Sequence, residues 1–105
     1  MERIHHIKEL LVKNIHKPHS INTLADIACM NRTKLQAGFK NIFGNTIYGF
    51  LAEERMKRAH QLLITGEYIK IADIARQIGF KNPNHFSTAF KKRFGYLPKD
   101  IQNQN

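Results

Sequence analysis

Residues 82–95, NPNHFSTAFKKRFG, combine an apolar stripe with side chains that can hydrogen-bond or carry positive charge. In a helix, Phe86, Phe90 and Phe94 would follow one another at four-residue intervals on one face. At about 100° per residue, the other side would carry Asn84, His85, Ser87, Thr88, Lys91 and Lys92. A helix that lies in the major groove of DNA needs such a polar face above a buried one, although many surface helices share the pattern.

An earlier part of the chain repeats this pattern. Leu24-Ala25 corresponds to Ile74-Ala75 at an offset of 50 residues, and after a one-residue insertion Phe39-Lys40 corresponds to Phe90-Lys91 at an offset of 51. Each copy reads as a short helix, a tight turn and a longer helix, which is the helix-turn-helix pattern. A duplicated structural bundle would need the apolar stripe twice but not the polar face twice. The repeat therefore favours two DNA-reading helices.

The chemistry of the two polar faces suggests which residues contact which part of DNA. Small or amide side chains near the middle of each face suit base edges, and cations and polar groups at the margins suit phosphates. The candidates for base reading are Thr33, Gln36, Ala37, Asn84, His85 and Thr88. The candidates for phosphate binding are Arg32, Lys34, Lys40, Lys81, Asn82, Ser87, Lys91 and Lys92.

The charge of the chain points to the same kind of partner. Among 105 residues, 17 Lys and Arg stand against 8 Asp and Glu, which gives a net charge of +9 and a pI near 10.0. The segments 31–44 and 76–99 contain cations and no acid. A polyanion, and nucleic acid first of all, is the expected partner.

Other classes of function find little support in the sequence. The six histidines show neither an HExxH pattern nor Cys/His spacing, so we expect no metal site, no cofactor and no enzyme activity. Cys29 aligns with a turn glycine, Gly79, and is expected to be a small packed residue rather than a nucleophile. No apolar run approaches the length of a membrane span and no signal peptide is evident, so a cytoplasmic, nucleoid-associated protein is expected, monomeric as this chain.

Helical periodicity without any period-2 alternation predicts an all-α fold of about seven helices. The expected helices cover about 2–16, 21–29, 32–43, 46–65, 71–78, 83–94 and 98–102. Ser20, Asn31 and Asn82 are the expected N-caps, and Gly44 and Gly95 the expected stops. In the second helix Leu24, Ile27 and Ala28 should face inward. Arg55 is expected to form an ion pair with Asp73 or Asp26.

The order and spacing of these residues resemble the DNA-binding domain of the AraC/XylS transcription regulators. The matching residues include Ile78-Gly79-Phe80, Asn82-Pro83, His85-Phe86-Ser87, Phe94-Gly95 and Pro98. Lys34-Leu35, Gly38-Phe39-Lys40 and Phe43-Gly44-Asn45-Thr46 are similar to the branch of pyochelin-type siderophore regulators. The resemblance implies one DNA-binding domain over 1–105, with a first helix-turn-helix module at about 4–44, a linker helix at about 46–65 and a second module at about 71–103.

This resemblance implies a sequence-specific double-stranded DNA-binding domain of a bacterial transcription activator or other regulator. Two recognition helices would enter successive major grooves, and RNA polymerase is a possible second partner. Family members commonly carry a separate ligand-binding domain, so the chain is either a compact stand-alone activator or the DNA-binding part of a longer, effector-responsive protein. The likeness to the siderophore-regulator branch favours the longer protein. The alternative from the residues alone is a helical module that binds nucleic acid without sequence preference or binds another protein.

Overall fold

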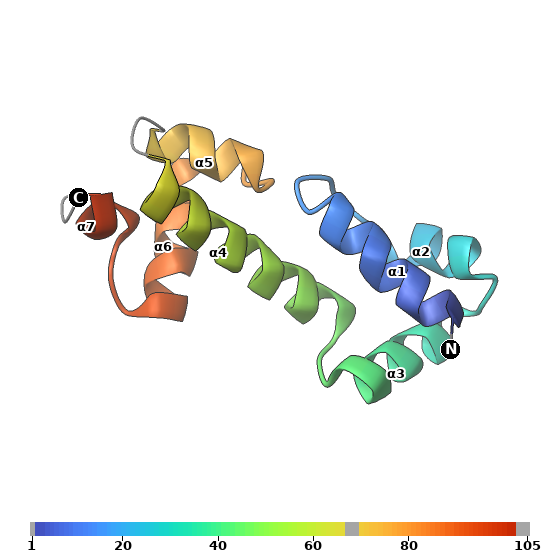
Figure 1. The fold of residues 1–105 in the computed structure, drawn as a ribbon. Coiled ribbons are helices and arrows are strands. Elements are labelled where there is room, and N and C mark those ends of the chain that lie inside the picture. Colours follow the sequence, from blue (N-terminus) through green and yellow to red (C-terminus); the bar gives the residue numbers. More distant parts are fainter. Residues whose placement is uncertain (1, 67–69, 103–105) are drawn as a thin grey trace. The chain divides into compact units, whose positions relative to one another are not determined.

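The computed structural model describes residues 2–66 and 70–102, which form seven α-helices and contain no β-strand (Figure 1). The helices are α1 (Glu2–Lys13), α2 (Ile21–Ala28), α3 (Arg32–Phe43), α4 (Ile47–Thr65), α5 (Ile71–Gln77), α6 (Pro83–Phe94) and α7 (Pro98–Gln102). The predicted all-α class and the number of helices are confirmed. None of the helices in these ranges is long and apolar enough to cross a membrane.

The chain divides into two compact units, Met1–Glu53 and Glu54–Asn105, and the boundary falls inside α4. Unit 1 contains α1, α2, α3 and the first part of α4, and unit 2 contains the rest of α4 with α5, α6 and α7. The predicted end of the second module, at residue 103, lies outside the described residues.

The predicted caps fix where the two longer helices of the repeat begin and end. The Asn31 side chain accepts a hydrogen bond from the backbone N–H of Lys34 at 2.8 Å, and the Asn82 side chain accepts one from Asn84 at 2.8 Å. Gly44 and Gly95 follow the last turns with φ of 75° and 86°. Glycine adopts these left-handed angles without the clash that a Cβ would introduce, so α3 and α6 stop at matching places.

Three helices, α1, α2 and α5, end earlier than predicted. α1 stops at Lys13, three residues before the expected end, because the chain turns there: the Asn14 side chain donates to the carbonyl of Leu10, and Lys17 N–H donates to the carbonyl of Asn14. α2 ends at Ala28 and α5 at Gln77, each one residue short of its expected end.

One apolar residue lies on the wrong side of the predicted core. Ile27 was expected to face inward, yet its exposed fraction is 43%, whereas Ala25 is buried at 4%. α2 makes only about two turns, and Leu24, Ala25 and Ala28 already occupy the arc that faces the core. The repeat also indicates that this position is exposed, since the polar residue Gln77 occupies the position of Ile27 in the second copy.

The repeat extends beyond the two helix-turn-helix segments. On α1, Ile4, Ile7 and Leu11 are buried, and residues 52 positions later on α4, Met56, Ala59 and Leu63, are also buried. The start of α4 in turn matches α7, where Ile47 corresponds to the buried Pro98. Thus the first part of α4 is the last element of the first copy, and its later part is the first element of the second copy.

The helices that follow α3 and α6 are capped by different hydrogen bonds. Before α4, the Thr46 hydroxyl accepts a hydrogen bond from Gly49 N–H at 3.0 Å. Before α7, the Asp100 carboxylate accepts one from Leu97 N–H at 3.0 Å. A complete capping box contains both bonds, and each copy here has one of them.

Candidate nucleic-acid interface

The outward faces of α3 and α6 carry the predicted base-reading residues. All six of them, Thr33, Gln36, Ala37, Asn84, His85 and Thr88, are exposed. On the opposite side of each helix the middle of the apolar stripe is fully covered, with Leu35 and Phe39 at 0% exposure in α3 and Phe86 and Phe90 at 0% in α6. Each helix is therefore held by its buried apolar side and exposes its polar side to solvent.

Most of the predicted phosphate-binding residues are also accessible. Seven of the eight are exposed: Arg32, Lys34, Lys40, Lys81, Asn82, Lys91 and Lys92. Ser87 is only half-buried, and the Asn82 carboxamide oxygen is already the acceptor that caps α6. The cations keep their ammonium or guanidinium groups in solvent, where they can meet a polyanion.

Aromatic contacts hold both helices in matching ways. Phe39 and Phe43 lie with ring centroids 4.7 Å apart in unit 1, and their counterparts Phe90 and Phe94 lie 4.6 Å apart in unit 2. In unit 1 the Lys8 ammonium sits over the Phe43 ring at 5.6 Å. The matching residue in unit 2 is a histidine, His60, whose ring lies 5.0 Å from that of Phe94. Both stripes therefore end against a basic side chain.

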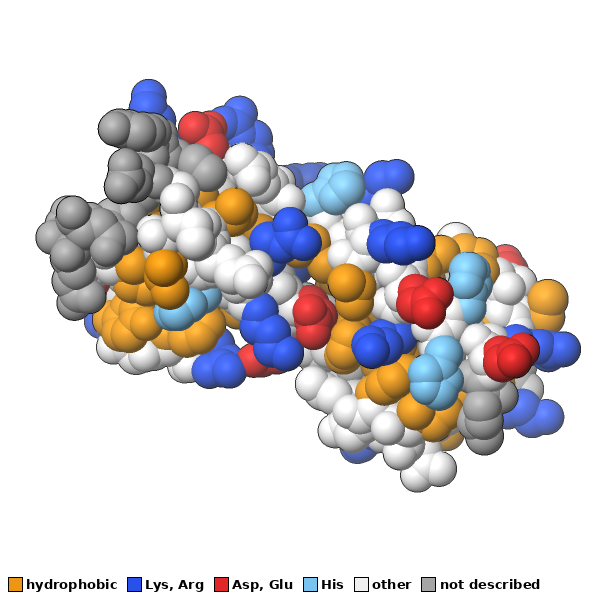
Figure 2. Space-filling model, viewed as in Figure 1, with side chains coloured by type: hydrophobic (Ala, Val, Ile, Leu, Met, Phe, Trp, Pro, Cys, Tyr) orange, Lys and Arg blue, Asp and Glu red, His pale blue; other side chains and the backbone are white. Residues whose placement is uncertain are grey.

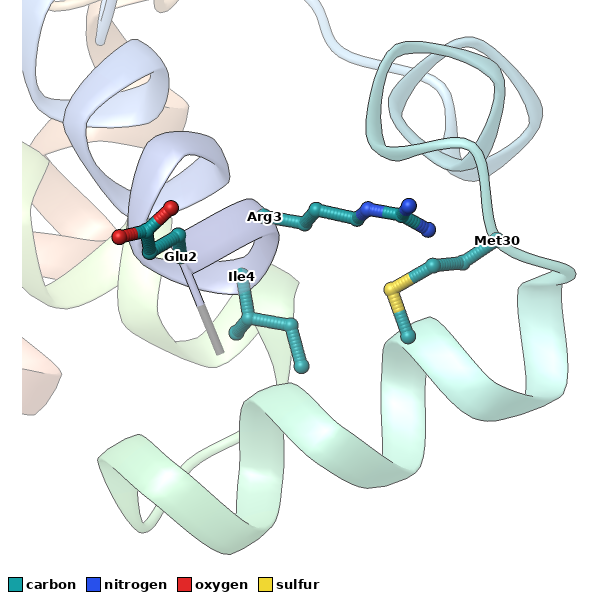
Figure 3. Close-up of a pocket in the computed structure, with 4 residues that line it drawn as sticks. All are labelled: Glu2, Arg3, Ile4 and Met30. Carbon is teal, nitrogen blue, oxygen red and sulfur yellow. The ribbon is translucent and has the colours of Figure 1, made fainter.

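In unit 1 a close approach between α1 and α3 depends on a glycine. A Cβ on Gly38 would lie 2.5 Å from Cδ1 of Ile4, so with any other residue at position 38 the Ile4 side chain would have to move. Figure 3 shows Ile4 with Glu2, Arg3 and Met30 around a neighbouring cavity of about 490 Å³. The packing of α1 against the buried side of α3 leaves the polar side of α3 free.

The turn between α2 and α3 corrects one expectation. Cys29 was expected to be packed, but it is exposed and adopts the left-handed conformation with φ of 55°. Its counterpart Gly79 has φ of 98°, so both turns require positive φ, which costs a non-glycine residue. The guanidinium of Arg3 donates to the Cys29 carbonyl at 3.4 Å and ties the turn to α1.

The electrostatics of the two faces favour an anionic partner. Neither α3 nor α6 contains an acid, whereas the face in Figure 2 shows Asp and Glu side chains among Lys and Arg. Unit 1 carries seven Lys and Arg against four Asp and Glu, and unit 2 carries ten against four. The second copy therefore has the stronger positive charge.

Three charged residues outside α3 and α6 bear on another prediction. Asp73 forms an ion pair with Arg76, its neighbour on α5. Burial lowers the pKa of the half-buried Arg55 guanidinium from its ordinary value. The expected pairing of Arg55 with Asp73 or Asp26 stays a prediction. In the described part of the chain no group of three or more His, Cys, Asp or Glu is placed to hold a metal ion.

One exposed aromatic residue beside the outward face of α3 did not emerge from the sequence patterns. Tyr48, on the first turn of α4, is 52% exposed and lines the same cavity as Gln36, Ala37 and Lys40. A signal for it exists in the repeat, because the residue 51 positions later is a lysine, Lys99, that is also exposed.

Comparison with known proteins agrees with this geometry. A family model described as a helix-turn-helix domain matches residues 24–104. The chain is similar to the regulatory protein PchR of Pseudomonas aeruginosa, with 43% identity over 67 residues, which is 64% of this chain and 23% of PchR. It is also similar to the HTH-type transcriptional regulator AlkR of Acinetobacter baylyi, with 36% identity over 85% of this chain and 29% of AlkR. The chain thus spans less than a third of the length of either relative.

A solved structure shows the same fold. The DNA-binding domain of the global transcriptional factor AdpA, in complex with a target DNA, superposes with a TM-score of 0.89 and 22% identity over 97% of this chain and 91% of that one. The family model covers most of the chain, and the group that it describes consists of regulator domains rather than enzymes. The chain therefore belongs to the AraC-type helix-turn-helix family of DNA-binding transcription regulator domains.

Proposed function

We propose that α3 and α6 are the two recognition helices of this domain and that they enter successive major grooves of double-stranded DNA. The observation that carries the proposal is the matched division of both helices into a buried apolar stripe and an exposed, acid-free polar face. A recognition helix needs a rigid base and accessible hydrogen-bonding groups at the same time. Helices with that division occur here twice, at equivalent places of a repeat.

The residues on these faces divide by chemistry. Asn84 can form a pair of hydrogen bonds with adenine, and Gln36 can do the same in the first copy. Thr88 can donate to or accept from a base, whereas Ala37 offers only an apolar contact, as with a thymine methyl group. Thr33 and His85 complete the proposed set of base-reading residues. With two hydrogen-bonding residues near the centre of its face, α6 is the more discriminating reader.

The cations around the faces supply affinity rather than discrimination. Lys40 and Lys91 occupy the same corner of the two helices, and Arg32, Lys34, Lys81 and Lys92 flank them. If about six phosphates are neutralised, log K falls against log salt with a slope near −5. Asn82 and Ser87 add neutral hydrogen bonds to phosphate oxygens in this proposal.

The remaining parts of the function concern the whole protein. We propose that the chain acts on chromosomal DNA in the cytoplasm, as a monomer in this form, within a longer effector-responsive regulator that contacts RNA polymerase. The resemblance of residues 34–46 to the branch of pyochelin-type siderophore regulators implies a regulator of iron acquisition, and we propose this role on that resemblance alone.

Selection and sequencing of random duplex DNA bound by this chain at near-physiological salt tests the proposal. We expect a two-part motif whose centres lie about 10 bp apart, one helical turn of DNA. A single half-motif would show that only one helix reads sequence. Salt-sensitive binding without any motif would refute sequence recognition and leave a nonspecific binder of polyanions.

A further inference from the structure

A cavity of about 240 Å³ opens on one flank of α3 in unit 1. Its lining comes from three helices: Ile21 at the start of α2, Gln36, Ala37 and Lys40 on α3, and Thr46, Ile47 and Tyr48 around the start of α4. It contains one cation and no acid. Three of these residues also belong to the proposed DNA-contacting face, so the cavity continues that face to one side.

Tyr48 forms the exposed edge of this cavity. Its hydroxyl donates a hydrogen bond to the carbonyl of His19 at 3.0 Å, which fixes the position of the ring. The ring itself remains 52% exposed, while Ile47 beside it is buried at 2%. The packing of α4 in unit 1 thus uses Ile47 and leaves Tyr48 as a fixed aromatic surface beside the recognition face.

The dimensions of DNA indicate what would lie against this flank. An α-helix with its side chains is about 10–12 Å across, and the major groove is about 12 Å wide. A helix inserted there has a sugar–phosphate backbone on each side of it. Because Gln36, Ala37 and Lys40 line both the cavity and the outward face, the cavity would lie beside one of those backbones.

We propose that Tyr48 and this cavity bind the deoxyribose–phosphate backbone of the DNA strand that flanks α3. This inference rests on the proposed function of α3. The Tyr48 ring and the apolar wall formed by Ile21 and Ala37 pack against a deoxyribose, which is the apolar part of the backbone. The Lys40 ammonium pairs with the adjoining phosphate. The contact adds affinity and fixes the position of α3 without reading a base.

The second copy has a lysine, Lys99, where the first copy has the backbone-contacting residue Tyr48. At an offset of 51, Lys99 takes the place of Tyr48, Lys91 that of Lys40, and Thr88 that of Ala37. Lys91 and Lys99 are both exposed. The flank of α6 therefore offers two cations where the flank of α3 offers one cation and a ring. We infer that module two holds the backbone by charge, and that module one holds it by charge and sugar packing together.

The test compares Tyr48→Ala and Tyr48→Lys with a matched control, Val12→Lys, on the duplex selected by the unmodified chain. Val12 is 36% exposed and lies on α1, which packs against the buried side of α3. Tyr48→Ala is expected to weaken binding about tenfold on specific and mismatched duplexes alike. Tyr48→Lys introduces the side chain that Lys99 has at the matching position of the second module. It is expected to steepen the slope of log K against log salt by about 0.9, whereas Val12→Lys changes that slope much less.

The outcomes separate the two levels of the proposal. If the unmodified chain selects no motif, the proposed function fails and this inference fails with it. If it selects a motif but Tyr48→Ala binds as well as the unmodified chain, and Tyr48→Lys steepens the slope no more than Val12→Lys does, only the inference is overturned. Thermal melting verifies that each variant is folded. Should Tyr48→Ala unfold, the slopes of the two lysine variants decide.

Discussion

The close approach of α1 to α3 yields a prediction whose size follows from one distance. In Gly38→Ala the new Cβ would stand 2.5 Å from Cδ1 of Ile4, so the Ile4 side chain must move. Overpacking of this kind costs about 1–3 kcal/mol, and the cavity beside Ile4 favours the lower half of that range. Alanine in a helix interior offsets about 1 kcal/mol through its higher helix propensity. We expect Gly38→Ala to destabilise the protein by about 0.5 kcal/mol, the difference between these two effects.

A second substitution isolates the cause. Ile4→Val removes Cδ1, and the next Ile4 atom, Cγ1, lies 3.9 Å from the position of the new Cβ, which is an ordinary contact distance. Ile4→Val alone should cost about 0.5–1.5 kcal/mol. In that background Gly38→Ala should stabilise by about 0.5–1 kcal/mol, because only the gain in helix propensity remains. The sign of the Gly38→Ala effect thus reverses between the two backgrounds.

Urea denaturation of the four proteins measures this as a double-mutant cycle. The expected coupling between positions 4 and 38 is about 1–1.5 kcal/mol, within the range found for residues in contact. A coupling below about 0.5 kcal/mol would refute the reasoning, since Gly38→Ala would then act the same whether or not Cδ1 is present. The packing of α1 on α3 would have to be looser than described.

Three further predictions concern charge, backbone conformation and capping. Lys91→Ala should flatten the slope of log K against log salt by about one unit and leave base preference unchanged. Asn84→Ala should relax the preference at one base pair and leave that slope unchanged, and salt titrations on matched and mismatched duplexes distinguish the two effects. Cys29→Gly should stabilise the chain by about 1 kcal/mol, because φ of 55° strains a residue with a Cβ, and no rise in melting temperature would contradict this. Thr46→Ala should cost about 1 kcal/mol by urea denaturation, because Gly49 N–H loses its acceptor, and an unchanged midpoint would show that water replaces the hydroxyl.

The sequence predicted what local chemistry controls. Asn31 and Asn82 cap their helices as expected because a carboxamide next to free backbone N–H groups needs no tertiary context. The aromatic stripe of α6 could be predicted in the same way, since three phenylalanines at four-residue spacing fall on one face of a helix and can be buried together only there. The outward residues then follow as the complement of the stripe.

The failures share a different cause. The helical pattern predicts Ile27 inward, and alignment with a turn glycine predicts Cys29 packed, but a two-turn helix and its turn bury only the arc that touches neighbouring helices. Tyr48 was missed because its position beside α3 depends on how α2, α3 and α4 meet, which no local pattern encodes. The internal repeat indicated part of this, because Gln77 aligns with Ile27 and Lys99 aligns with Tyr48 in the second copy.

The sharing of α4 between the two units has a consequence for how the protein folds. Starting a helix is the unfavourable step, with a nucleation constant of about 10⁻³, whereas each added residue extends it at little cost. In unit 1 the buried Ile47 and Leu51 hold the first turns of α4, and in unit 2 Met56, Ala59 and Leu63 hold the rest. Whichever unit forms first supplies the other with a helix already begun, so one nucleation event serves two modules. The second module is thereby spared a kinetic barrier that an isolated copy of it would face alone.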